Sequence, residues 1–148
     1  MEIKEFSFKN CLPQLRELFK THWEEVASNK HSRNLNIDED MFILLEENKI
    51  LLSIGAFNED ILIGYSINII SKDTHDCTKI LCGNDALYVS MEYRKGSIGI
   101  KLIKETEKQA KKLNCYGVVW HAKPNSSLDK LLEKLDYNIK DFLYLKEV

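Results

Sequence analysis

Two spacings of apolar residues divide the first third of the chain into a strand and two helices. Apolar and polar residues alternate over residues 2–8, which predicts a short β-strand. Between residues 11 and 27 apolar residues recur every three or four positions, which predicts an amphipathic helix with Pro13 in its first turn, where proline is tolerated. Residues 28–37 are polar and predict a loop, and residues 38–48, which begin with acidic side chains, predict a second helix.

Strand patterns dominate the rest of the chain. Residues 50–57 and 61–70 are apolar runs separated by a short polar turn, which predicts a β-hairpin. The next elements are predicted as a strand over 78–90 that bends near Gly83, a helix over 97–113 and a strand over 116–122. A helix capped by Asn125 or Ser126 and a final strand over 137–148 complete the chain. A hairpin combined with one strand–helix–strand crossover predicts a single α+β domain over residues 1–148. Its mixed central sheet is mostly antiparallel, with one parallel pair, and is flanked by helices.

Composition narrows the classes of partner. The net charge is −2 and arginine occurs three times, which argues against a nucleic-acid-binding surface. No apolar run approaches the ~20 residues of a membrane span, and the N-terminus lacks the apolar core of a signal peptide, so no membrane partner is expected. The four cysteines form no CxxC pair and no zinc-ligand spacing, which predicts reduced thiols in a cytoplasmic protein without a metal.

The turn that leads into the 97–113 helix has an unusual composition. It contains two cations, two glycines and a serine, in the order Arg94-Lys95-Gly96-Ser97-Ile98-Gly99. A helix N-terminus exposes unpaired N–H groups that attract anions, and glycine lets a ligand approach the backbone closely. The turn therefore favours a phosphate site, although glycine-rich turns also arise from packing alone. It is neither a P-loop nor a dinucleotide fingerprint, because GxxxxGK[ST] and GxGxxG are both absent.

The same residues resemble motif A of the GCN5-related N-acetyltransferases (GNAT family), which reads R/Q-x-x-G-x-G/A. The preceding LYVSMEYR resembles the strand and turn before that motif, and PNSSLDKLLEKLDY resembles the motif B helix. The resemblance covers nearly the whole chain and implies a GNAT fold, in which the fourth strand splays from the fifth. Two positions depart from the family pattern: Ser97 replaces the first glycine, and Leu132 stands where many members have a proton-donating tyrosine.

The resemblance implies a binding site for acetyl-CoA as acetyl donor. Backbone groups of Leu87, Tyr88 and Val89 are expected to pair with the pantetheine amides, as a strand pairs with an edge. Backbone N–H groups from Arg94 to Gly99 are expected to hold the pyrophosphate. Asn125, at the start of the next helix, is expected to touch the cofactor as well.

The resemblance also implies direct acetyl transfer to a primary amine, with no metal and no covalent enzyme intermediate. A base must remove the proton of the amine, and His121 and Asp85 are the candidates. Imidazole titrates near neutral pH, and an apolar setting raises the pKa of a carboxyl group towards a useful value. Asp85 is two residues before Leu87 and is expected to share its face of the strand. The alternatives are a core histidine bonded to backbone and an acid at a strand end paired with solvent or a lysine.

The acceptor side is expected to involve His22 and Glu25, which are three residues apart on one helical face. An acidic wall favours a cationic amine: a polyamine, an aminoglycoside, another small amine, a peptide N-terminus or a protein lysine. The alternative is a solvated acidic turn. Pairing of two copies through terminal strands is compatible with the resemblance. The alternative function is a non-catalytic acyl-CoA-binding or protein-interaction domain on the same scaffold, which Ser97 and Leu132 favour.

Overall fold

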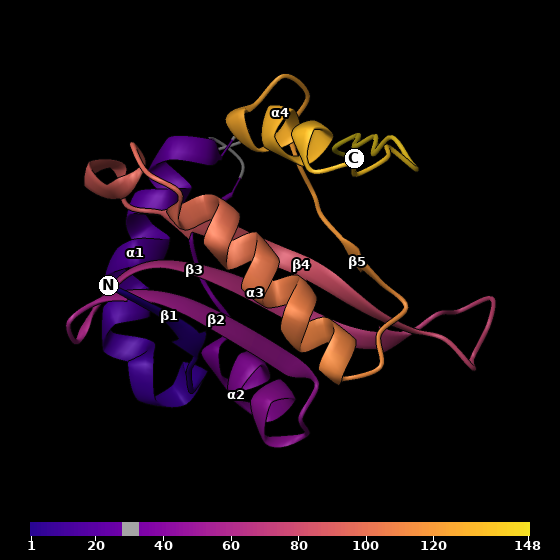
Figure 1. The fold of residues 1–148 in the computed structure, drawn as a ribbon, viewed down its shortest axis with the longest axis horizontal. Coiled ribbons are helices and arrows are strands. Elements are labelled where there is room, and N and C mark those ends of the chain that lie inside the picture. The colour runs from indigo at the N-terminus through magenta and orange to yellow at the C-terminus, as the bar shows by residue number, and fades with distance from the viewer. Residues whose placement is uncertain (28–32) are drawn as a thin grey trace.

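A five-stranded sheet forms the centre of the molecule (Figure 1). The computed structural model describes residues 1–27 and 33–148, so part of the predicted 28–37 loop lies outside the described residues. The strands follow one another in sequence order across the sheet as β1 (Glu2–Glu5), β2 (Leu51–Asn58), β3 (Ile61–Lys72), β4 (Ile80–Val89) and β5 (Gly117–Val119). Neighbouring strands are antiparallel except for the parallel pair β4–β5. The predicted mixed sheet is therefore confirmed.

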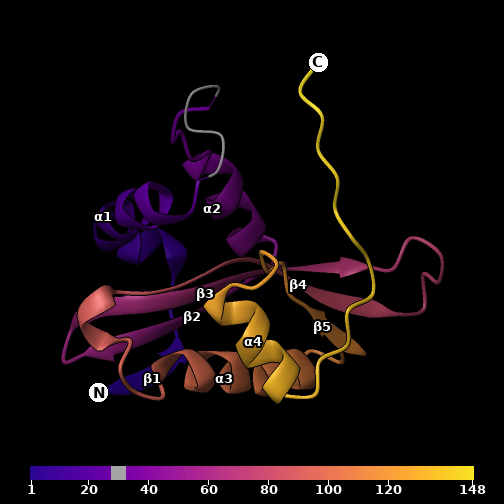
Figure 2. The same cartoon turned by 90° about the horizontal axis from the view of Figure 1, so that it is seen from above.

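Helices cover both faces of this sheet (Figure 2). The helices are α1 (Phe8–Val26) and α2 (Glu39–Glu47) on one face, and α3 (Ile98–Lys112) and α4 (Ser127–Lys134) on the other. A short 3-10 turn, η1 (Met91–Tyr93), follows β4. Each face has its own apolar core: α1 and α2 pack on aromatic and aliphatic residues of the sheet, and α3 packs mainly on aliphatic ones. The order of the elements from β1 to α4 and the crossover through α3 agree with the sequence prediction.

The start of α1 differs from the prediction. The helix begins at Phe8, which is fully buried, and Ser7 caps it by accepting from the N–H of Asn10 at 3.3 Å. Glu46 of α2 also accepts from the N–H of Phe8 at 2.5 Å, so a carboxylate stabilises the positive end of α1. Because the helix starts earlier, Pro13 lies in its second turn rather than its first, and the helix continues through it.

The C-terminal segment also differs from the prediction. Residues 138–148 form no strand and are exposed, and they run away from the body of the molecule (Figure 2). The strand β5 has three residues, against the seven predicted for 116–122, so it offers a short edge to a further strand. Alternation of apolar residues is a local signal, whereas a strand also needs a neighbouring edge.

Within residues 1–27 and 33–148, no helix is long and apolar enough to cross a membrane. In the same part of the chain, no group of three or more His, Cys, Asp or Glu side chains is arranged to hold a metal ion.

Candidate active site

The strands β4 and β5 separate along their length. The strand β5 pairs only with Leu81–Gly83, so it leaves the outer edge of the second half of β4 uncovered. The N–H of Ser90 donates to the carbonyl of Ile63 at 2.8 Å, and Val89 lies opposite Gly64. This pattern puts Val89 at a non-hydrogen-bonded position of the antiparallel ladder. The N–H and C=O of Val89 therefore point to the open edge.

Along β4 the N–H and C=O groups of successive residues point alternately to β3 and to the open edge. This alternation decides which of the predicted residues can bind the cofactor through the backbone. Leu87 is two residues before Val89, so its N–H and C=O also face the open edge. The backbone of Tyr88 faces β3, where it pairs with Tyr65. Leu87 and Val89 thus have backbone groups directed as the prediction requires. The prediction for the backbone of Tyr88 is wrong, because its groups belong to the β3–β4 ladder.

A β-bulge lies in β4 next to the open edge. Ile67 pairs with Ala86 and the next residue, Asn68, pairs with Asn84, so Asp85 is an extra residue without a partner on β3. The extra residue interrupts the usual alternation of side chains. Asp85 and Ala86 consequently both line a pocket on the face that carries α1 and α2.

The bulge changes which side chains share a face. Leu87 packs into the core beneath α3, whereas Asp85 lies on the α1 side, so the prediction that they share a face is wrong. The predicted bend near Gly83 is also misplaced, because Gly83 pairs regularly with Ile69 and the irregularity comes two residues later.

Buried polar side chains hold the bulge together. The amide nitrogen of Asn84 lies 2.9 Å from Oδ1 of Asn68 and 3.2 Å from the carbonyl of Ala86. The amide of Asn68 donates to the carbonyl of Leu52 at 3.0 Å. Both asparagine side chains are buried, and so is Thr106 of α3, which joins the cluster through Ser66. A buried network with its partners satisfied defines one geometry, so it fixes the place of the extra residue.

The carboxylate of Asp85 has a raised pKa. Asp85 is exposed as a residue, yet the apolar pocket wall partly buries its carboxylate and raises its pKa above the ordinary value. The charge of His121 opposes this rise, so the two side chains lie near enough to interact. His121 follows the end of β5 rather than lying within the strand. The structure thus places the two predicted catalytic side chains within range of each other's charge, across the gap between β4 and β5.

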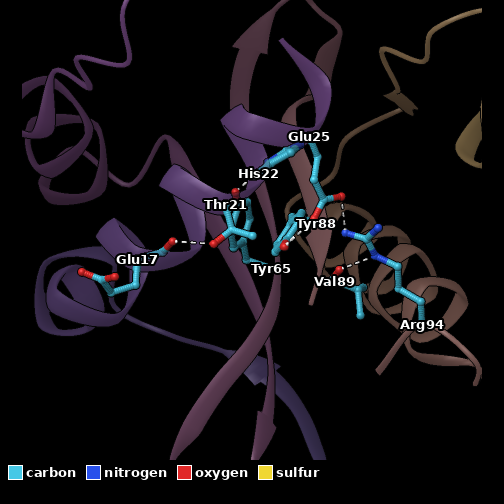
Figure 3. A network of polar contacts seen from close by, with 8 residues as sticks. All are labelled: Glu17, Thr21, His22, Glu25, Tyr65, Tyr88, Val89 and Arg94. Atoms are coloured by element: carbon cyan, nitrogen blue, oxygen red, sulfur yellow. Dashed lines mark hydrogen bonds and ion pairs between the residues drawn. The ribbon is translucent and has the colours of Figure 1, made fainter. Parts of the chain in front are cut away.

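An ion-pair network joins α1 to the end of β4 (Figure 3). Arg94 donates through Nη2 to Oε2 of Glu25 and through Nε to the carbonyl of Val89, both at 2.7 Å. The hydroxyl of Tyr88 donates to Oε1 of Glu25 at 3.0 Å, and the guanidinium lies 5.2 Å from the centre of the Tyr88 ring. Arg94 therefore faces α1 rather than the predicted pyrophosphate turn. Its own N–H donates to Met91 at 3.3 Å, which leaves the N–H groups from residue 95 onward as candidates.

His22 is held in the same network (Figure 3). Its Nδ1 lies 2.7 Å from the hydroxyl of Tyr65, and its ring stacks on Tyr88 with centroids 4.8 Å apart. Burial lowers the pKa of His22, which favours the neutral imidazole. His22 and Glu25, predicted to bind the acceptor, are thus each engaged by neighbouring side chains. The network gave no signal in the sequence, because its members come from distant parts of the chain.

The turn before α3 has the space that a phosphate group needs. A Cβ added at Gly96 would meet nothing within 4 Å, and one added at Gly99 would meet only Cδ2 of Leu131, at 4.0 Å. Neither glycine has a positive φ, so the backbone does not require glycine at either position. Ser97, the N-cap residue of α3, makes no side-chain capping bond, and the first N–H groups of a helix have no partner within it. The turn therefore has the room and the N–H donors that a phosphate group needs.

The other predicted residues lie around this turn. Lys95 is exposed, and Ile98 is buried in the core beneath α3. Asn125 has a φ of 62° and its N–H donates to Oδ2 of Asp129 at 2.7 Å, at the entrance to α4. Leu132 is 8% exposed, so an apolar side chain fills this position in α4.

Comparison with known families decides the identity of the site. Residues 12–137 match the family model described as the acetyltransferase (GNAT) family. The chain belongs to the GNAT acetyltransferase family. Acetyl-CoA is accordingly the acetyl donor, which agrees with the open edge of β4 and the glycine turn. No curated protein matches the chain.

Solved structures share the fold of this GNAT acetyltransferase at low sequence identity. An acetyltransferase of Trypanosoma brucei is 14% identical, with a TM-score of 0.77 and 99% of each chain covered. A ribosomal-protein-alanine N-acetyltransferase of Brucella melitensis biovar Abortus 2308 is 16% identical, with a TM-score of 0.75 over 100% of each chain. An aminoglycoside N-acetyltransferase, AAC(6')-Iy, solved in complex with CoA, is 16% identical, with a TM-score of 0.71 over 99% of this chain and 100% of its own.

Proposed function

We propose that the protein transfers the acetyl group of acetyl-CoA directly to a primary amine of a small molecule or protein. The observation that carries this proposal is the uncovered edge of β4. It presents the backbone of Leu87 and Val89 next to the bulged Asp85 and runs on into the glycine turn. Acceptors named for two structural relatives, aminoglycosides and a ribosomal-protein alanine, contain amines and are compatible with this chemistry.

The residues that hold the donor follow from this edge. The N–H and C=O groups of Leu87 pair with pantetheine amides, as an added strand does, and the N–H of Val89 is left for the thioester end of the donor. The N–H groups from Lys95 to Gly99 hold the pyrophosphate, with the charge of Lys95 in support. Asn125 lies at the entrance to α4, whose Leu131 approaches Gly99. Acetyl-CoA supplies the acetyl group as a thioester.

Proton transfer falls to Asp85. Only a neutral amine is a nucleophile. The ammonium form therefore gives up a proton to the Asp85 carboxylate, directly or through one water molecule. The imidazolium form of His121 stabilises that carboxylate. The new C–N bond replaces the C–S bond, and the N–H of Val89 faces the thioester oxygen as it gains negative charge. Thiols of this kind have a pKa of about 8.5, so the sulfur leaves as a thiolate and takes a proton from solvent, without a tyrosine at Leu132.

Arg94 positions this site rather than touching the reacting atoms. It holds the carbonyl of Val89 from the open side and is itself held by Glu25. The N–H of Val89 is thereby kept directed at the gap between β4 and β5. A cytoplasmic location and pairing of two copies remain predictions of the sequence.

Two measurements test the function. One is the release of the CoA thiol from acetyl-CoA in the presence of each of a panel of amines, and the other is mass spectrometry of the products. The wild type should release thiol only with an amine and should form the N-acetyl product. Asp85→Asn should lower kcat by about 10²-fold or more, and His121→Gln should lower it less. Asp60→Asn, in the exposed turn between β2 and β3, is the matched control and should keep full activity. Acetyl-CoA binding without turnover of any amine would instead support the non-catalytic binding domain, which the buried Leu132 favours.

A further inference from the structure

An apolar pocket of about 140 Å³ lies beside Asp85, on the sheet face that carries α1 and α2. Side chains from both helices, from β3 and β4 and from the segment after α1 converge on it. Its apolar wall includes the side chains of Phe19, Trp23, Leu35, Phe42 and Ile67. This wall differs from the acidic one that the sequence predicts.

The polar groups around the pocket have different roles. His22 and Tyr65 also line it, but each is the other's hydrogen-bond partner at 2.7 Å. Glu25, the predicted acidic contact, is paired with Arg94. Asp85 has no ion pair or hydrogen bond to a side chain among residues 1–27 and 33–148, apart from the nearby charge of His121. The pocket therefore combines an apolar wall with one carboxylate at its rim.

The size and polarity of the pocket select one class of amine. An apolar cavity of about 150 Å³ binds benzene, so this pocket can hold one aromatic ring. A polyamine or an aminoglycoside would instead place further cations or hydroxyls against apolar side chains, where they would lack hydrogen-bond partners. We infer that the acceptor is a small primary amine on a short arm from an aromatic ring, with the ring between α1 and β3 and the amine at Asp85. This inference rests on the proposed function and names its acceptor class.

Binding and turnover of three amines test the inference separately from the function. The probes are 2-phenylethylamine, ethylamine and spermidine, each titrated calorimetrically into the protein saturated with CoA, and each assayed for thiol release with acetyl-CoA. The ring should raise affinity at least about 100-fold over ethylamine, because a hydrophobic pocket gains about 10-fold or more per methylene-sized group and the ring is several such groups. Spermidine should bind no better than ethylamine. Equal affinities for the three amines, or preference for spermidine, would overturn the inference.

The binding arm keeps the two proposals distinguishable. If 2-phenylethylamine binds selectively but no amine is acetylated, the pocket assignment stands and the proposed function fails. If amines are acetylated without regard to the ring, the function stands and the acceptor class is wrong.

Two tryptophan variants locate the ring. Leu35→Trp adds bulk inside the pocket and should reduce the affinity for 2-phenylethylamine at least 10-fold. Leu44→Trp adds the same bulk on α2 at a residue that is 58% exposed and does not line the pocket, and it should have no effect on that affinity. Titration with acetyl-CoA checks that both variants are folded. Full affinity for 2-phenylethylamine in Leu35→Trp would place the ring elsewhere and contradict the inference.

Discussion

Replacing Asn84 with alanine should destabilise the protein and disturb the position of Asp85. Asn84 is 3% exposed, and its amide nitrogen lies within 3.2 Å of four acceptors on Ser66, Ile67, Asn68 and Ala86. An amide nitrogen has two hydrogens, so alanine removes two good bonds at a time, each contributing about 1 kcal/mol. The buried carbonyl groups left without a donor cost about 1 kcal/mol more.

Added together, these contributions give an expected loss of about 3 kcal/mol in the free energy of unfolding. For a chain of 148 residues this lowers Tm by about 6–12 °C. Urea unfolding followed by circular dichroism measures the loss. Asn10→Ala, at an exposed position of α1, is the matched control and should change stability by less than about 0.5 kcal/mol.

The same variant tests how the bulge supports chemistry. If the asparagine network fixes the extra residue of β4, Asn84→Ala should also reduce kcat/KM at a temperature where the variant is fully folded. A loss of stability below about 1 kcal/mol would refute the reasoning, because it would mean that the network does not hold the strand.

Three further predictions concern other contacts. Glu25→Gln should lower the free energy of unfolding by about 1 kcal/mol, since the Arg94 and Glu25 side chains are only 39% and 24% exposed. A double-mutant cycle with Tyr88→Phe should show coupling of about 0.5 kcal/mol or more, and additive effects would mean that Glu25 and Tyr88 do not interact. Asp85→Asn should raise Tm at pH 7, because burial disfavours the ionised carboxylate of the folded state. The gain in Tm should vanish as the pH falls through the raised pKa of the folded state towards the unfolded value of about 4. A gain that persists at pH 3 would contradict this origin. Glu46→Ala should lower the free energy of unfolding in urea by about 2 kcal/mol, because it removes the acceptor at the start of α1. An equal loss in the exposed control Glu47→Ala would disprove a specific role for Glu46.

Local patterns were sufficient to predict most of the fold. The three- and four-residue spacing of apolar side chains predicts α1 because that spacing reports a buried face whatever the helix packs against. The cap at Ser126 and the glycine turn before α3 are equally local, since each depends on a few consecutive residues. The turn is therefore recognisable from its own composition and its family resemblance, and its assignment as the donor site stays a prediction.

Features that depend on distant pairing could not be predicted. The bulge at Asp85 arises because residues 67 and 68 of β3 face three residues of β4, and nothing within β4 alone shows that count. The direction of Arg94 depends on Glu25, which is 69 positions away. Asn84 gave a partial signal, because asparagine is uncommon in strand interiors and here marks an irregular position.

Calorimetric titration of acetyl-CoA into the wild type and Gly99→Glu tests the central claim most directly. Gly99 is the second residue of α3, where a carboxylate favours the helix, so the substitution should raise Tm slightly in the absence of ligand. The wild type should bind acetyl-CoA saturably in the micromolar range typical of enzyme substrates, on the order of 1 μM–1 mM. Gly99→Glu should not bind it, because the carboxylate would face the pyrophosphate. A wild type that fails to bind at millimolar acetyl-CoA, or a variant that binds equally well, would contradict the assignment of this turn.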